Sequence, residues 1–243
     1  RLAAMVPFGR CSTELAHLCG IEVSAKTVER VAELVGAQIG RKSSEFEAHV
    51  LSGKAKEPES APDRLYVTVD GAMAPMRGGY RECKVGAVYE ARVDDDGEIM
   101  AHSIEHVGTF GDAEAIADKL YAVAFTRGVE KCKDVVVLGD GGRWIWKQAK
   151  NNFPKATQIL DFYHAAEHLS EVAHAWYGAG TKKAENWLEE RLLDFLEGRW
   201  ERVMRSIRAW KPIEAEDIKT KNSNLGYFRW NRERMRYDHY RTN

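Results

Sequence analysis

The chain has 243 residues, enough for one or two domains with a sizeable hydrophobic core. Hydrophobic residues make up 44% and charged residues 30%, a composition that excludes collagen-like, wholly disordered and disulfide-scaffold proteins. Lys and Arg (36) nearly balance Asp and Glu (37), and the net charge of −1 excludes a globally basic surface, so any nucleic-acid contact must come from local patches.

The four cysteines are scattered and form no CxxC pair, so the sequence predicts neither a disulfide framework nor a cysteine zinc site. Reduced thiols indicate a cytoplasmic protein. No apolar run reaches the roughly 20 residues of a membrane helix, and the N-terminus lacks the apolar region of a signal peptide, so we expect no membrane partner. A chain that begins at Arg1 and stops at Asn243 is expected to be cut at both ends.

Residues 1–50 are predicted to be helical, because apolar residues recur at helical spacing with breaks near Gly20 and Gly36. Their pattern has the outline of a helix-turn-helix, in which Gly20 takes the left-handed turn and Ser24 caps the second helix. A helical hairpin that packs on the rest of the protein is an equally open alternative. In the first interpretation, the residues facing a DNA groove are Lys26, Thr27 and Arg30.

Residues 51–64 are polar and lack periodicity, which predicts a linker. The chain then becomes β-rich, and turn-like residues at Gly78-Gly79 and 94–97 indicate an antiparallel meander. The strands of this meander are predicted at residues 65–70, 84–93 and 99–107.

Helices and strands alternate after the meander. They are predicted as a helix over 112–127, a buried strand over 134–140, a helix over 143–151, a short strand over 157–161 and a helix from His164. The order βββαβαβ, antiparallel first and parallel later, is typical of a ribonuclease-H-like fold. We therefore expect an α/β protein with a ribonuclease-H-like mixed-sheet core over residues 65–170 and an all-helical region over residues 171–243.

Two aspartates occupy comparable places in this order: Asp70 is predicted to end the first strand and Asp140 the fourth, each before a glycine. In the ribonuclease-H-like order these strands are neighbours, so the two carboxylates would project side by side and repel each other. Divalent cations relieve such repulsion, and two Mg²⁺ or Mn²⁺ ions can activate water or a 3′-hydroxyl for phosphodiester attack. The alternative is that each Asp-Gly pair forms an ordinary turn.

A second polar cluster lies where the last strand meets its helix. Asp161 and His164 have the spacing Asp-x-x-His, which would place an acceptor and a titratable donor near the same sheet edge. His164, Glu167 and His168 also match the inverted zinc-protease pattern His-x-x-Glu-His, so a zinc hydrolase is an alternative. His168 itself is expected to be a packed helix residue.

Aromatic residues occur directly after the second aspartate and again near the C-terminus. Trp144 and Trp146 follow the second aspartate, and both are expected to pack in the core. The alternative is that one of them lines a DNA channel. Near the C-terminus, arginines alternate with aromatic residues, which suits phosphate contacts and base stacking, although a helix with a solvated basic face has the same pattern. The arginines expected to contact DNA are Arg229, Arg232, Arg234 and Arg236.

Several blocks of sequence resemble bacterial insertion-sequence transposases of the Kra type, which are DDE enzymes related to Mutator-like transposases. These blocks include Val69-Asp70-Gly71, the run from Val135 to Trp146 and the stretch from Phe153 to Leu169, and the part from Asp140 to His168 is the most specific. Blocks at residues 6–9, 24–30 and 231–237 are similar too, so the resemblance spans nearly the whole chain.

The resemblance implies a nucleoid-associated transposase that cuts and joins element ends by Mg²⁺-assisted phosphoryl transfer, has a helical insertion in its core, and acts on double-stranded DNA as a homo-oligomer. Asp70 and Asp140 match the first and second acidic residues of the family, and Asp161 with His164 matches its Asp-x-x-His signature. The third acid belongs to a Gly-Ser-Gly-x-Val-Glu-like segment expected beyond Asn243. The alternative function is that of a non-catalytic DNA-binding or regulatory remnant.

Overall fold

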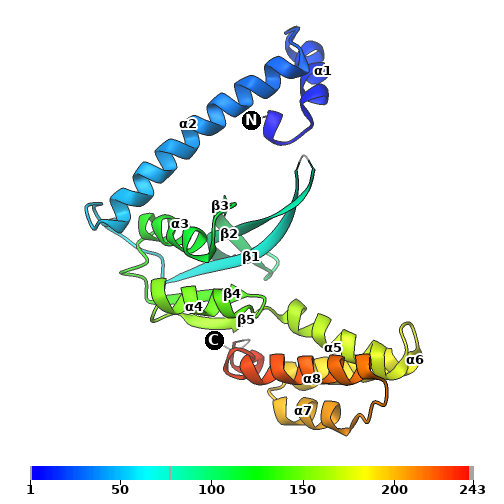
Figure 1. The fold of residues 1–243 in the computed structure, drawn as a ribbon. Coiled ribbons are helices and arrows are strands. Elements are labelled where there is room, and N and C mark those ends of the chain that lie inside the picture. Colours follow the sequence, from blue (N-terminus) through cyan, green and yellow to red (C-terminus); the bar gives the residue numbers. More distant parts are fainter. Residues whose placement is uncertain (1, 77, 241–243) are drawn as a thin grey trace. The chain divides into compact units, whose positions relative to one another are not determined.

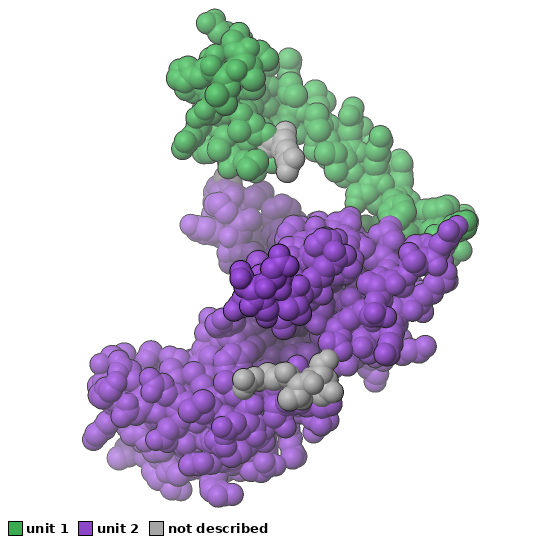
Figure 2. Space-filling model, turned by 180° about the vertical axis from the view of Figure 1, so that it is seen from behind, with its two compact units in different colours: residues 1–56 green, residues 57–243 purple. Residues whose placement is uncertain are grey.

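Two compact units make up the protein, residues 1–56 and residues 57–243 (Figure 2). The structure, a computed structural model, describes residues 2–76 and 78–240. The first unit is helical, and the second combines a five-stranded mixed sheet with helices (Figure 1). The prediction of an α/β protein with a mixed sheet is therefore confirmed.

The helices of the first unit begin and end where local sequence signals predict. Gly20 ends the first helix in the left-handed conformation, with a φ of 66°. The Ser24 hydroxyl caps the second helix by accepting a hydrogen bond of 3.1 Å from the backbone N–H of Thr27. The elements of this unit are the 3₁₀ turn η1 (Leu2–Ala4) and the helices α1 (Phe8–Cys19) and α2 (Ala25–Leu51).

The break predicted near Gly36 is wrong, because α2 continues through this residue over a length of 27 residues. A single glycine inside a helix costs about 1 kcal/mol relative to alanine, which is too little to end a helix whose neighbouring residues are good helix formers.

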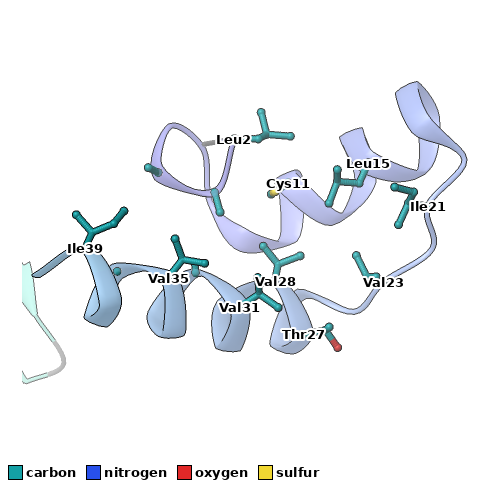
Figure 3. A pocket seen from close by; sticks show the side chains of 14 residues that line it. Leu2, Cys11, Leu15, Ile21, Val23, Thr27, Val28, Val31, Val35 and Ile39 are labelled. Atoms are coloured by element: carbon teal, nitrogen blue, oxygen red, sulfur yellow. The ribbon is translucent and has the colours of Figure 1, made fainter. Parts of the chain in front are cut away.

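An apolar groove of about 500 Å³ separates α1 from α2 (Figure 3). Cys11 of α1 and Val28 of α2 are buried at this groove, whereas Val31, Val35 and Ile39 further along α2 remain about half exposed. The short α1 therefore covers only part of the apolar face of α2.

The sheet of the second unit has the strand order β3-β2-β1-β4-β5 (Figure 1). The first three strands form an antiparallel meander, β4 is parallel to β1, and β5 is parallel to β4. The first and fourth strands are thus neighbours, as predicted. The strand bounds are β1 (Arg64–Met76), β2 (Gly79–Val93), β3 (Ile99–Thr109), β4 (Asp134–Gly139) and β5 (Thr157–Leu160).

Asp70 does not end the first strand, contrary to the prediction. β1 continues to Met76 because its second half remains paired with β2, and only the pairing with β4 ends at Val69. The chain reverses at Gly78 and Gly79, whose φ values of 94° and 148° suit glycine, rather than at the Asp-Gly step.

Helices α3 (Ala113–Thr126) and α4 (Arg143–Asn152) contact each other and cover one face of the sheet. Val67 and Val137 from the strands meet Ile116 of α3 and Ile145 of α4 in this layer. The packing is tight at the end of β4, where a Cβ on Gly139 would lie 2.8 Å from the Ile145 side chain.

A second helical layer follows the sheet along the chain, so the described part of the chain beyond residue 171 is helical, as predicted. Helix α5 packs against α6 and α8, and α7 packs against the same two helices (Figure 1). Tyr237 returns to the sheet, where its hydroxyl donates a 3.0 Å hydrogen bond to the carbonyl of Leu160. The bounds are α5 (Phe162–Tyr177), α6 (Lys182–Leu196), α7 (Trp200–Ala209), α8 (Ala215–Trp230), η2 (Arg232–Arg234) and α9 (Tyr237–Tyr240).

A buried ion pair fixes the end of α6. Asp194 is only 1% exposed, and its carboxylate lies 2.8 Å from Nε of Arg191, which is itself buried. The other carboxylate oxygen accepts a 2.7 Å hydrogen bond from Nε of Arg199. This carboxylate therefore compensates the charge of a buried guanidinium.

Replacing Asp194 with Asn should lower the free energy of unfolding by about 3–5 kcal/mol, because the buried Arg191 loses its buried counter-charge and keeps only its ion pair with the exposed Glu190. Urea unfolding followed by circular dichroism measures the change. The exposed pair of Glu216 with Lys219 is the control, and Glu216→Gln should change stability by less than about 0.5 kcal/mol. Equal losses in the two variants would contradict the prediction.

Candidate functional site

Three aspartates lie at one level of the sheet. Val69, Gly139 and Leu160 pair with one another across β1, β4 and β5. The residue that follows this row in the sequence is an aspartate in all three cases: Asp70, Asp140 and Asp161. Because parallel strands run in the same direction past this row, the structure places these aspartates at one level, at the edge where β1 stops pairing with β4 and β4 stops pairing with β5.

Asp70 is exposed, and its Oδ1 accepts a 2.7 Å hydrogen bond from the backbone N–H of Gly71. Lys84 lies opposite Gly71 on β2. Its ammonium is 3.3 Å from the Glu82 carboxylate and 5.5 Å from the centre of the Trp144 ring. Lys84 thus places a nearly buried cation close to this edge, a feature that the sequence analysis missed.

Asp140 is half-buried and held from two sides. Its Oδ1 accepts a 2.7 Å hydrogen bond from the backbone N–H of Gly142, and its carbonyl accepts a 2.6 Å hydrogen bond from the Tyr227 hydroxyl. Gly141 between them has a φ of 95°, and a Cβ there would lie 2.7 Å from the Tyr227 ring and 2.8 Å from the Asn231 amide. The loop after Asp140 is therefore pressed against α8 and requires glycine.

Polar contacts hold Tyr227 in place. The His168 ring stacks on the Tyr227 ring with the centroids 3.6 Å apart. His168 Nδ1 lies 2.7 Å from Oδ1 of the buried Asn224, whose amide donates a 2.9 Å hydrogen bond to Glu171. Burial first and then the charge of Asp140 raise the pKa of Tyr227, so its hydroxyl remains a donor at ordinary pH.

Asp161 has a structural role as the N-cap of α5. Its Oδ1 accepts hydrogen bonds of 2.7 Å from the N–H of Tyr163 and 3.4 Å from the N–H of His164. The His164 Nδ1 is 3.9 Å from the same oxygen and has no hydrogen-bond partner among the residues that the structure describes. In the structure, the Asp-x-x-His spacing therefore serves to cap the N-terminus of α5.

The described residues hold no group of three His, Cys, Asp or Glu side chains arranged to bind a metal ion. His168 is stacked and hydrogen-bonded inside the helical layer, as expected for a packed residue, so the zinc pattern has no ligand cluster here. Asp70 and Asp140 each use one carboxylate oxygen to accept a backbone hydrogen bond, from Gly71 within β1 and from Gly142 in the loop after β4. The second oxygen of each could serve as a hard ligand for Mg²⁺ or Mn²⁺.

The two tryptophans after Asp140 differ in burial. Trp146 is 3% exposed, and its indole N–H donates a 2.9 Å hydrogen bond to Oδ1 of the buried Asn231. Trp144 is half-buried and packs against the core from its edge. The role of Asn231 as the partner of Trp146 was not predicted, because the two residues lie far apart along the chain.

The arginines expected to contact DNA near the C-terminus fall into two groups. Arg229, Arg232 and Arg236 are exposed, and Arg232 forms a 3.1 Å ion pair with Glu201. Arg234 is instead tied into the fold. Its guanidinium lies 4.6 Å from the centre of the Trp146 ring and donates a 2.9 Å hydrogen bond to Gln158, and burial lowers its pKa.

The three residues expected to face a DNA groove lie in the first turns of α2. Lys26 and Arg30 are exposed, and Lys26 forms a 2.9 Å ion pair with Glu29. Thr27 lies 3.0 Å from the Ser24 hydroxyl and lines the apolar groove (Figure 3). The beginning of α2 therefore exposes the cations Lys26 and Arg30, whereas Thr27 lines the apolar groove.

No protein-family model matches this chain, and no curated protein sequence matches it either. Within residues 2–76 and 78–240, no helix combines the length and the apolar composition that a bilayer crossing requires.

Replacing Gly141 with Ala should lower the free energy of unfolding by about 1–3 kcal/mol. The reason is that a Cβ is strained at positive φ and meets the Tyr227 ring. Gly226 of α8 is the matched control. Its surroundings are open, so Gly226→Ala should be neutral or stabilise by up to about 1 kcal/mol. Chemical denaturation of both variants tests this contrast, and an unaffected Gly141→Ala protein would refute the close contact.

Proposed function

We propose that this protein is a DNA transposase of the DDE type with a ribonuclease-H-like catalytic core. The observation that carries the proposal is the shared level of Asp70 on β1 and Asp140 after the neighbouring parallel strand β4. Two carboxylates on adjacent strands form a natural start of a divalent-cation site. The strand order β3-β2-β1-β4-β5 and the similarity of both aspartate blocks to Kra-type transposases support the same proposal.

Asp70 and Asp140 are the proposed ligands of Mg²⁺ or Mn²⁺. When bound, the ions supply an activated water or 3′-hydroxyl and stabilise the leaving oxygen during phosphodiester attack. The hydrogen bonds from Gly71 and Gly142 fix one oxygen of each carboxylate, and the other oxygen of each is the proposed ligand of the ion. The hydroxyl of Tyr227 holds the backbone of Asp140 and so limits the movement of this ligand.

Asp161 and His164 are proposed to border the same site. Asp161 stands at the same level as the other two aspartates, and the Nδ1 of His164 is left without a hydrogen-bond partner among the described residues. An unpaired ring nitrogen beside a carboxylate is suited to a polar contact with bound DNA. The third metal-binding acid is proposed to come from the family's later Gly-Ser-Gly-x-Val-Glu-like segment.

The proposed partners are the double-stranded ends of the element and the target DNA, bound at the nucleoid by an oligomer of this protein. Exposed cations suited to phosphate contacts are present at the start of α2 and near the end of α8. The second candidate function is a DNA-binding remnant without catalysis. It is favoured by the finding that no third acid completes a metal cluster among the described residues.

Mg²⁺ or Mn²⁺ should raise the melting temperature of the protein, because an ion that binds only the folded state stabilises it by mass action, about 2.7 kcal/mol at 100 times its Kd. Asp140→Asn should abolish this gain. Asp217→Asn, which removes a carboxylate from the first turn of α8, should preserve it. An equal gain in all three proteins would place the cation elsewhere and contradict the proposed ligands.

Cleavage of element-end DNA tests the enzymatic proposal directly. These 243 residues should fold and bind metal but show little Mg²⁺-dependent strand cleavage, because a DDE site needs a third carboxylate to position its ions. A longer natural chain that contains the Gly-Ser-Gly-x-Val-Glu-like segment should cleave, and Asp70→Asn should stop it. Robust cleavage by the 243 residues alone would show that an acid within them completes the site.

A further inference from the structure

One face of α4 is basic. Arg143, Lys147 and Lys150 are exposed and spaced so that they lie along the same side of the helix. The opposite side carries the buried residues Ile145 and Ala149, and α4 contains no acidic residue. No ion pair engages Lys147 or Lys150 within residues 2–76 and 78–240. The basic side chains of α4 are therefore available to an anion.

A half-exposed tryptophan stands beside this basic face. Trp230, at the end of α8, is 49% exposed, and the Arg143 guanidinium lies 5.0 Å from the centre of its ring. Tryptophans usually bury most of their large apolar surface, so a half-exposed ring offers an aromatic surface to a partner. This ring also lines a groove of about 410 Å³, together with Gln158, Arg229, Arg232, Arg234 and Tyr240.

Positive charge is concentrated here on a chain whose net charge is only −1. The exposed cations are Arg143, Lys147 and Lys150 on α4 and Arg229 and Arg232 at the groove. Two glutamates accompany these cations: Glu233 lines the groove, and Glu201 pairs with Arg232. A local excess of cations on a nearly neutral protein favours a polyanion.

We infer that α4 and the Trp230 groove bind a single-stranded nucleic acid, with phosphates along the basic face and a base stacked near Trp230. An exposed ring favours an unpaired strand, because the faces of the bases are covered in a duplex and free in a single strand. The inference deepens the proposed function, since α4 begins directly after the loop of Asp140. A strand held on α4 is thus led to the edge where Asp70 and Asp140 lie.

Fluorescence anisotropy with labelled oligothymidylate and with a duplex of equal length, both without divalent cation, tests the inference on the full chain. The single strand should bind more tightly than the duplex. Lys147→Gln with Lys150→Gln should weaken binding of the single strand and reduce the slope of log K against log salt by about 1.4, the value for two lost phosphate contacts. The matched control is Lys182→Gln with Lys183→Gln, two exposed lysines at the start of α6.

Trp230→Ala should weaken single-strand binding by roughly ten-fold while leaving the salt slope unchanged, because it removes stacking and no charge. Trp230→Phe should restore most of the affinity, which separates stacking from a packing defect. Tyr80→Ala removes another exposed aromatic ring, 73% exposed, and should have no effect. Melting temperatures of all variants report whether each one is folded.

Three outcomes would overturn the inference. They are equal affinity for duplex and single strand, an α4 variant that behaves like the α6 control, and full affinity in a folded Trp230→Ala protein. Binding of the single strand requires no metal, so it can succeed when Mg²⁺ fails to stabilise the protein. That combination would refute the proposed catalytic site and leave the strand-binding surface intact.

Discussion

The hydrogen bond from the Tyr227 hydroxyl to the carbonyl of Asp140 joins the two layers of the second unit at the candidate site. The bond connects α8 of the helical layer with the residue that follows the central strand β4. It requires a glycine at position 141, because a Cβ there would fall within 2.7 Å of the tyrosine ring. The conformation of the Asp140 loop therefore depends on how α8 is placed, and α8 in turn is fixed by the polar contacts beneath it.

Those contacts give the helical layer a direct role in the candidate site. Asn224 and Asn231 are fully buried, and each uses its side-chain amide as both acceptor and donor: Asn224 toward His168 and Glu171, Asn231 toward Trp146 and the Tyr227 carbonyl. Satisfied buried amides specify a single arrangement, since any shift would leave polar groups without partners. The position of the Asp140 backbone is thus set by side chains on α4, α5 and α8 together.

The sequence predicted what is encoded locally. The turn at Gly20, the cap at Ser24 and the alternation of strands and helices depend on nearby residues, and the structure has them. It failed where distant pairing decides: β1 passes through the Asp-Gly step at Asp70 because β2 stays paired with it. Tyr227 was missed as a contact of Asp140 for the same reason, because 87 residues separate them and neither the tyrosine nor its spacing signals a role.

Helix α4 links the candidate metal site to the basic face. Its first residue follows Gly142, whose backbone holds the Asp140 carboxylate, and its buried side carries Ile145 against the end of β4. The exposed side of the same helix carries Lys147 and Lys150, which form no ion pair with any residue that the structure describes. A short helix packed at native density moves as one body, so a displacement that repositions the lysines also strains the loop of Asp140. A strand bound on this face would thus stabilise the conformation of α4 that holds the Asp140 carboxylate in place, and strand and metal binding are expected to reinforce each other.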